Sequence, residues 1–262
     1  MDIIVCIKQV PDTNDVRIDE KKGTLIREGV PSIINPDDKH AIEEALRIRE
    51  KVGGKITILT MGPPQADDAL RESLAMGADE AILLTDRAFA GSDTWATAYS
   101  IGKAVQAIGK FDLIIAGRQA IDGDTAQVGP QMAEYLELPQ ITYARKIEIV
   151  DGKAVVERAL EDGHETLETS LPALITVIGD LNEPRYPTIK GIVTAYRDKE
   201  VGQMTAADLN ADEAKIGLKG SPTQVKKTFV MVPKREGELI EGSAKEAAGT
   251  LIERLQDKNV LR

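Results

Sequence analysis

Four short apolar runs constrain the fold of this chain more than any other feature. They cover residues 3–7, 55–60, 81–85 and 112–116, and they are rich in Ile, Val and Leu without alternating polar positions. Runs of this kind are typical of strands that are buried on both faces of a sheet. Helical patterns separate them, so the sequence predicts an α/β fold. Its mostly parallel sheet has right-handed crossovers and carries helices on both faces.

The helices between these strands have recognisable ends. Asn35 is expected to cap the first helix, Pro36 suits its first turn, and the carboxylates of Asp37 and Asp38 face the positive end of its dipole. The other three helices are expected over residues 65–76, from Ser92 or Asp93 to Ile108, and over 125–136, with Gly77 and Gly109 as stops.

From about residue 141 the spacing becomes that of hairpins. Asp151-Gly152 and Asp162-Gly163 mark two tight turns. We expect antiparallel additions at one edge of the sheet, with strands over residues 147–150, 154–156, 165–169 and 173–177.

Beyond Gly179 the periodic pattern is lost for a long stretch. Residues 180–240 carry many charges and no sustained apolar face, which is unusually long for a connection inside a domain. The sequence therefore predicts a domain over residues 1–180 and an extended arm over 181–262 that a partner orders.

The arm is expected to end in a helix. A capping box of Ser243 and Glu246 begins it. Its apolar stripe, which packs either on the main domain or on another subunit, consists of Ala247, Ala248, Leu251, Ile252 and Leu255.

The densest motif is the stretch Gly-Arg-Gln-Ala-Ile-Asp-Gly-Asp-Thr-Ala-Gln-Val-Gly-Pro at residues 117–130. It follows an expected strand and precedes a helix, which is where open α/β sheets bind ligands. Its glycines let a ligand approach the backbone, and the helix start offers free N–H groups to a phosphate. The motif predicts a nucleotide site, with an ordinary glycine-rich turn as the alternative. Walker and G-x-G-x-x-G sequences are absent, which argues against standard NTPase and dehydrogenase sites.

A second loop, Gly91-Ser92-Asp93-Thr94, faintly resembles that of ATP pyrophosphatases. It lacks one glycine and the leading serine of that motif, so helix capping is the preferred interpretation.

Composition excludes several functions. A net charge of -10 with 3% aromatic residues argues against nucleic-acid binding and an anionic membrane. One cysteine and two histidines cannot assemble the usual zinc sites, so no metal site is expected. Cys6, in a buried strand, is expected to act as a small hydrophobe.

No convincing acid, base or nucleophile set is present, so no catalytic residue is assigned, and chemistry would come from a bound cofactor. We expect a cytoplasmic protein without membrane insertion.

Five stretches carry a family resemblance: residues 5–12, Asn35-Pro36 with 41–45, 74–79, 117–127 and, most specifically, 156–167 running to 171–176. On them the chain resembles the β (small) subunit of electron-transfer flavoproteins over essentially its whole length. The resemblance implies a heterodimer with an α subunit, in which a Rossmann-like domain over 1–180 holds a nucleotide and the arm over 181–262 wraps the partner. It also implies the nucleotide-binding residues, which are Cys6, Asn35, Pro36, Asp37, Asp38, Met61, Gly117, Arg118, Gln119, Ala120, Ile121, Asp122, Gly123, Asp124, Thr125, Ala126, Gln127 and Val128.

The family has two branches, with structural AMP in simple carriers and FAD in electron-bifurcating members. Residues 122–130, with Val10-Pro11-Asp12-Thr13, look like the bifurcating type of anaerobic bacteria, and Gly123 and Ala126 would leave room for the larger cofactor. This resemblance implies that NADH reduces the β-subunit FAD. One electron then passes to ferredoxin or flavodoxin, and the other passes through an α-subunit FAD to an acyl-CoA dehydrogenase. The chain would be an oxidoreductase only as part of that complex.

Arg118 is the candidate for tuning the flavin, with a phosphate contact or a structural ion pair as alternatives. A non-bifurcating carrier with AMP is the alternative to the whole assignment, and a nucleotide-binding stress or pyrophosphatase module is a third.

Residues 182–192 resemble the family's partner-recognition loop. The resemblance implies that Ile189 enters a dehydrogenase pocket, flanked by Tyr186 and Ile192. The alternative is that Ile189 only anchors the loop to its own domain.

Overall fold

The computed structural model describes residues 1–12, 17–19, 24–26, 31–226, 237 and 239–261. The chain divides into two compact units, Met1–Lys226 and Lys227–Arg262, each of which is described by itself. Thr13, part of the predicted N-terminal match, lies outside the described residues.

A nine-stranded sheet forms the centre of the first unit, in the order β11-β10-β9-β12-β8-β1-β6-β7-β13 within the described chain. The four predicted apolar runs are confirmed as neighbouring parallel strands. They are β1 (Asp2–Cys6), β6 (Lys55–Met61), β7 (Glu80–Leu84) and β8 (Leu113–Gly117). Two small two-stranded sheets pair β2 (Gln9–Pro11) with β5 (Ser32–Ile34) and β3 (Arg17–Asp19) with β4 (Thr24–Ile26).

The antiparallel edge is confirmed in part. β9 (Gln140–Val150), β10 (Lys153–Leu160) and β11 (Gly163–Ser170) pair antiparallel, as the two turns predict. β12 (Ala173–Val177) was wrongly predicted as an antiparallel addition, because it lies inside the sheet and pairs parallel with both β8 and β9. All five of its residues are buried, which is the pattern of an interior strand.

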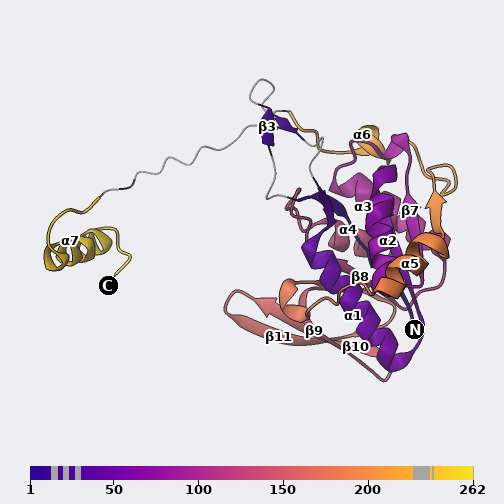
Figure 1. Ribbon diagram of the computed structural model, residues 1–262, viewed down its shortest axis with the longest axis horizontal. Helices are drawn as coiled ribbons and strands as arrows, with labels where there is room; N and C mark the ends of the chain where they lie inside the picture. Colours follow the sequence, from indigo (N-terminus) through magenta and orange to yellow (C-terminus); the bar gives the residue numbers. More distant parts are fainter. Residues whose placement is uncertain (13–16, 20–23, 27–30, 227–236, 238, 262) are drawn as a thin grey trace. The chain divides into compact units, whose positions relative to one another are not determined.

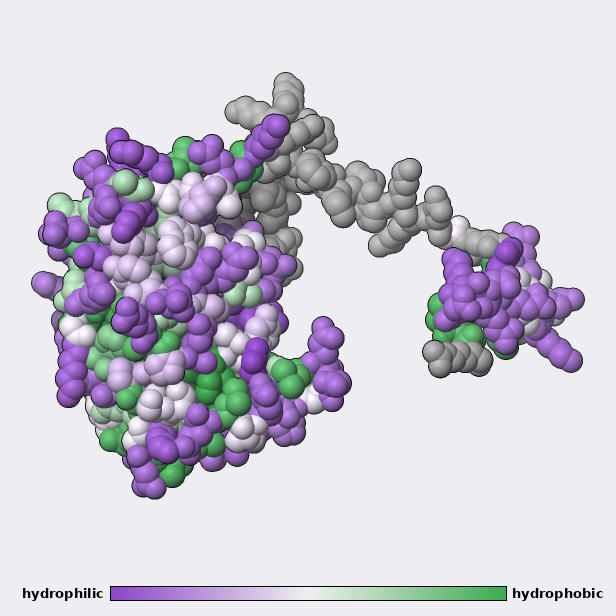
Figure 2. Space-filling view, turned by 180° about the vertical axis from the view of Figure 1, so that it is seen from behind, coloured by the Kyte–Doolittle hydropathy of each residue, from purple (hydrophilic) through white to green (hydrophobic). Residues whose placement is uncertain are grey.

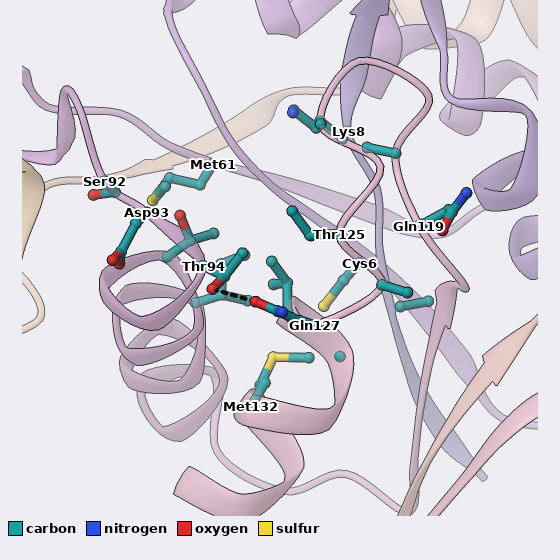
Figure 3. A pocket seen from close by; sticks show the side chains of 18 of the residues that line it. Cys6, Lys8, Met61, Ser92, Asp93, Thr94, Gln119, Thr125, Gln127 and Met132 are labelled. Carbon is teal, nitrogen blue, oxygen red and sulfur yellow. Dashed lines mark hydrogen bonds between the residues drawn. The ribbon is translucent and has the colours of Figure 1, made fainter. Parts of the chain in front are cut away.

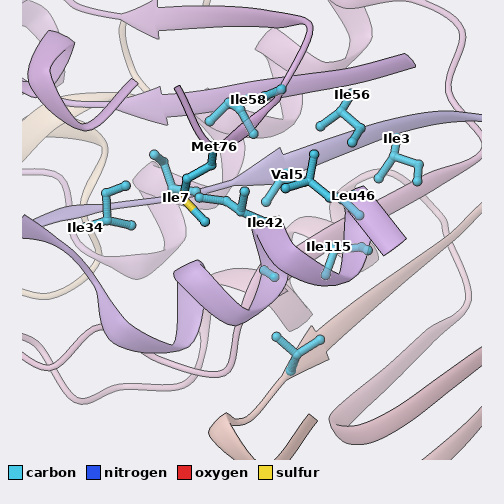
Figure 4. Close-up of a cluster of buried hydrophobic side chains, with 14 of the residues drawn as sticks. Ile3, Val5, Ile7, Ile34, Ile42, Leu46, Ile56, Ile58, Met76 and Ile115 are labelled. Carbon is cyan, nitrogen blue, oxygen red and sulfur yellow. The ribbon is translucent and has the colours of Figure 1, made fainter. Parts of the chain in front are cut away.

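Helices cover both faces of the sheet (Figure 1). α1 (Pro36–Val52) and α2 (Asp67–Met76) pack with Ile3 and Val5 of β1, whereas α3 (Thr94–Ile108) and α4 (Val128–Tyr135) pack with Ile4 and Cys6. Successive β1 side chains therefore point to opposite layers, as strand geometry requires. Figure 4 shows Ile42 and Leu46 of α1 among the β1 and β6 side chains of the first layer.

α4 begins three residues later than predicted. Asp124 and Ala126 have φ angles of 51° and 53°, and a right-handed helix cannot continue through such a conformation. Residues 124–127 therefore belong to the loop, and the helix starts at Val128.

The first unit runs well past the predicted boundary at residue 180. α5 (Ile189–Arg197) packs on α2 and fully buries Ala195, and β13 (Val201–Met204) pairs parallel with β7. These elements, with the four-residue α6 (Gly217–Gly220), place residues 181–226 in the same compact unit. β13 and α6 are too short to give a periodic signal. α5 does carry apolar residues at helical spacing, but that face is exposed, and its place in the unit comes from packing on α2.

The second unit contains α7 (Ala244–Asp257), and its predicted capping box is confirmed. The Ser243 side chain accepts a hydrogen bond from the Glu246 backbone, and the Glu246 carboxylate accepts one from the Ser243 N–H. None of its described residues is buried. Hydrophobic residues gather on one side of α7, and hydrophilic residues cover the side turned toward the viewer of Figure 2. Among the residues that the structure describes, no helix is long and apolar enough to cross a membrane.

Candidate functional site

A cavity of about 730 Å³ opens at the carboxyl ends of β1, β6 and β8. This is the edge of a parallel sheet at which α/β folds bind ligands. Thirteen of the predicted nucleotide residues line it: Cys6, Asp38, Met61, Gly117, Arg118, Gln119, Ala120, Asp122, Gly123, Thr125, Ala126, Gln127 and Val128. Figure 3 labels Cys6, Met61, Gln119, Thr125 and Gln127 among them.

Five predicted residues are not part of the described lining: Asn35, Pro36, Asp37, Ile121 and Asp124. Asn35 occupies the predicted N-cap position of α1, and its carbonyl accepts from the Asp38 N–H, but its fully buried side chain makes no capping bond in the described part of the chain. Its Nδ2 donates to the Gln119 carbonyl at 2.9 Å, and its Oδ1 accepts from the Ile121 N–H at 3.0 Å. Asn35 thus fixes the loop after β8 from the side that does not line the cavity.

Asp38 connects α1 to two strand ends. Its carboxylate accepts the Lys8 N–H at 2.7 Å and the Gly117 N–H at 3.0 Å. A Cβ at Gly117 would lie 2.2 Å from Asp38 Oδ1, so only glycine permits this approach. Burial raises the pKa of Asp38 to about 7, although the two backbone donors oppose that shift.

Cys6 faces the cavity from the end of β1 as a buried free thiol (Figure 3). Burial, with a smaller contribution from the Asp38 charge, raises the pKa of the Cys6 thiol to about 12. The thiol is therefore protonated near neutral pH and behaves as an apolar wall residue.

The loop over residues 117–128 is bonded to both sides of the cavity. Lys8 Nζ lies 2.6 Å from the Asp122 carboxylate, Gln119 donates to Asp124, and the Thr94 hydroxyl donates to Gln127 Oε1 at 3.0 Å (Figure 3). By contrast, no described atom lies within 4 Å of a Cβ built at Gly123. The loop is thus fixed at its ends and open at Gly123.

Sequence reasoning weighed the loop of the opposite wall but assigned it to helix capping alone, and it missed Thr223 and Val225. Gly91, Ser92, Asp93 and Thr94 line the cavity where α3 begins, and Thr223 and Val225 complete the wall. Asp93 does cap α3, accepting from the Ala96 N–H at 3.1 Å, as predicted. The same carboxylate accepts from the Thr223 N–H and hydroxyl. The position of this loop in the sequence could have identified it as part of the site. The loop follows β7, whose carboxyl end lies at the same edge of the sheet as those of β1, β6 and β8.

Arg118 stands at the end of β8 and forms the ion pair that was one of its predicted alternatives. Its Nε lies 3.5 Å from Asp37 Oδ2, and its guanidinium carbon lies 5.9 Å from the centre of the Tyr143 ring. Arg118 also lines the cavity, so one side chain belongs both to the ion pair and to the wall.

The predicted partner residues gather outside the cavity, at the start of α5. Tyr186 is 92% exposed and Ile189 is 84% exposed, and Ile192 is 45% exposed. Ile189 therefore does not anchor the loop to its own domain, which removes that alternative. Arg185 does so instead, donating to the buried Glu43 carboxylate at 2.7 and 3.0 Å.

The lining of the cavity is suited to binding a ligand. No group of three or more His, Cys, Asp or Glu side chains that could hold a metal occurs among the described residues. The floor is apolar, with Met61, Phe89, Ile101 and Met132, and the rim offers loop amides and the first turns of two helices. Such a cavity suits a large, partly apolar and anionic ligand, as a nucleotide is.

Comparison with known proteins gives matches over most of the chain. Residues 22–212 match the electron transfer flavoprotein domain. The electron transfer flavoprotein subunit beta of Thermoanaerobacterium thermosaccharolyticum is 62% identical over 261 residues, which cover 100% of both chains. The caffeyl-CoA reductase-Etf complex subunit CarD of Acetobacterium woodii is 51% identical, and the acryloyl-CoA reductase electron transfer subunit gamma of Anaerotignum propionicum is 45% identical, each over 100% of both chains.

Proposed function

Because the chain belongs to the electron transfer flavoprotein family, we propose that it is the β subunit of an electron-bifurcating heterodimer and binds FAD in the cavity described above. The α subunit is its permanent partner, and the arm that contains α7 docks on it. The exposed apolar side of α7, which has no buried residue in the described chain, supports this docking.

One observation carries the choice of FAD. The cavity of about 730 Å³ is large for a mononucleotide, and it remains open at Gly123, where no described atom would meet a Cβ. Bound there, FAD would supply the redox chemistry, taking hydride from NADH and releasing one electron to ferredoxin or flavodoxin and one through an α-subunit FAD to an acyl-CoA dehydrogenase.

The chain's own residues bind and shield such a cofactor rather than react with it. The part of the 117–128 loop that lines the cavity and the first turn of α4 would receive the anionic part, and the apolar floor would exclude water. The protonated Cys6 thiol adds apolar surface without a competing nucleophile.

The names of two relatives support the acyl-CoA side of the proposal, since they belong to caffeyl-CoA and acryloyl-CoA reductase proteins. The surface of this chain offers a matching contact. Tyr186, Ile189 and Ile192 form an exposed apolar group that Arg185 and Asn182 hold against α1. Exposed aromatic and aliphatic anchors of this kind are typical of protein interfaces.

The first test is a count of bound nucleotides. The chain is co-purified with its α partner, and the FAD and AMP released on denaturation are measured per heterodimer. Two FAD and no AMP support the proposal, whereas one FAD and one AMP would make the chain a structural and docking subunit of a simple carrier.

A steric variant sharpens this test. Gly123→Gln together with Ala126→Gln should fill the open part of the cavity and remove FAD from the β site. Gly163→Gln is the matched control, because no described atom lies within 4 Å of its built Cβ either and it does not line the cavity. Full FAD retention in the Gly123/Ala126 variant would refute the steric argument.

Docking has its own test. Ile189→Ala should weaken electron transfer to the acyl-CoA dehydrogenase while the flavin content stays unchanged. Val52→Ala, which removes an exposed apolar side chain at the far end of α1, should transfer electrons normally. Unaltered transfer in Ile189→Ala would end the assignment of this surface.

A further inference from the structure

Tyr143 occupies an irregular position in β9. Ile141 pairs with Ile175 and Ala144 with Val177, so two residues of β9 face the single Thr176 of β12. This is a β-bulge, and Tyr143 within it has a φ of 59°, a left-handed conformation that is unfavourable for a bulky residue. Its N–H donates to Thr176 Oγ1 at 3.3 Å. Bulges re-aim side chains, and outliers of this kind point to a functional constraint.

The bulge brings the Tyr143 ring to Arg118. The guanidinium carbon lies 5.9 Å from the ring centre, within the range of a cation–π interaction. The first turn of α1 brings Asp37 Oδ2 to 3.5 Å from Arg118 Nε. Three elements far apart in sequence thus converge on one cation: the end of β8, the start of α1 and the bulge of β9.

Only one of these three side chains reaches the cavity. Arg118 lines the cavity, whereas Asp37 and Tyr143 are not among its described lining residues. Arg118 Nε and Asp37 Oδ2 are buried and make no hydrogen bond to any described residue. Asp37 and Tyr143 therefore act on the cavity through Arg118.

The charges of the cluster oppose one another. Arg118 is positive at any accessible pH, and a carboxylate beside it cancels part of its field at the cavity wall. Burial raises the pKa of Asp37 above its ordinary value, and the charges of Arg118 and His40 oppose that shift only in part. A side chain that only anchored Arg118 could be neutral, whereas Asp37 is an acid whose ionised form bears the opposite charge.

We propose, building on the function proposed above, that Asp37 and Tyr143 are positioning residues for Arg118, and that Asp37 sets how much of the Arg118 charge an anionic nucleotide meets in the cavity. Asp37 thereby limits the electrostatic binding of the ligand. Removal of its charge strengthens the site rather than weakening it.

The direction of the change in ligand affinity distinguishes this proposal from a structural role of Asp37. Asp37→Asn should tighten binding of an anionic nucleotide roughly three- to tenfold, while Arg118→Gln should weaken it by a similar factor. Tyr143→Phe keeps the ring and should bind normally, whereas Tyr143→Leu removes the ring and should weaken binding. If Asp37 only stabilised α1 or the fold, its loss would weaken binding.

The experiment uses the full-length chain freed of nucleotide and titrated separately with AMP and with FAD. Trp95, the single tryptophan of the chain, is adjacent to Thr94 of the cavity wall, so its fluorescence can follow binding, with calorimetry as a second readout. Circular dichroism confirms that each variant folds. Asp68→Asn is the matched control, because it removes a first-turn carboxylate from α2 that does not line the cavity.

A double-mutant cycle decides the result. The proposal requires that Asp37→Asn tightens binding in the native background and has no effect when Arg118 is already Gln. Weaker binding in Asp37→Asn, or an effect that persists without Arg118, would overturn it. Binding of AMP but not FAD would refute the FAD assignment alone, since the AMP cycle still tests Asp37. A native chain that binds neither nucleotide would overturn both.

Discussion

Substitution of Gly117 tests the geometry on which the cavity depends. In Gly117→Ala the new Cβ would lie 2.2 Å from Asp38 Oδ1 and 2.9 Å from the Asp37 carbonyl carbon. Both are far closer than real Cβ contacts, and the second involves backbone of the first turn of α1. The start of α1 must therefore move away from the end of β8.

The magnitude follows from the bonds that this movement breaks. The hydrogen bond from the Gly117 N–H to Asp38 is 3.0 Å long, and a lost bond to a charged group costs about 1.5–3 kcal/mol. Overpacking of a rigid contact adds about 1–3 kcal/mol. We expect Gly117→Ala to lower the free energy of unfolding by about 2.5–6 kcal/mol and to reduce the nucleotide retained on purification.

Gly123→Ala is the control within the same loop. No described atom lies within 4 Å of its built Cβ, so its free energy of unfolding should stay within about 0.5 kcal/mol of the native value. Urea unfolding of both variants at pH 8, followed by circular dichroism, provides the comparison. If Gly117→Ala were as stable as Gly123→Ala and kept its nucleotide, the close approach of α1 to β8 would be wrong.

Three further predictions concern buried groups. Because burial raises the pKa of Asp38 from 3.8 to about 7, its protonated form favours folding below pH 4, and that contribution is lost as the pH rises to 7. Urea unfolding across this pH window should show the free energy of unfolding of the native chain falling by up to about 4 kcal/mol relative to that of Asp38→Asn. Parallel plots of the two free energies against pH would contradict the raised pKa. Cys6 should resist thiol reagents at pH 8 in the folded chain and react on unfolding; rapid labelling of the folded chain would show that it is accessible. Since Arg185 holds the pKa of Glu43 below its usual value, Arg185→Met should destabilise the chain by about 1–3 kcal/mol at pH 7 and by less as the pH falls through 4; a loss independent of pH would mean that packing, not the ion pair, is responsible.

The framework of the first unit could be predicted from sequence because its signals are local. The runs that become β1, β6, β7 and β8 are apolar throughout, since each strand is covered on both faces. The glycine stops at Gly77 and Gly109 likewise depend only on neighbouring residues. The loop over residues 117–128 was recognisable because it follows a buried strand directly.

Other features had signals that were ambiguous or too short. Residues 173–177 could equally have been an edge strand or an interior one, and their pairing with β8 and β9 decides between the two. β13 has four residues and gains its place only by pairing with β7. Asn35 reads as a helix cap, but the nearby loop carries donors and acceptors that engage its side chain instead.

The sequence alone determined the main strands and helices of the first unit and the position of the glycine-rich loop over residues 117–128. The tertiary structure decided which of those segments meet. It joined the start of α3 to the 117–128 loop across the cavity, and it brought Asp37 and Tyr143 to Arg118. The physical reason is that hydrophobic periodicity and capping act over a few residues, whereas these contacts depend on strand order and on a bulge that re-aims one side chain.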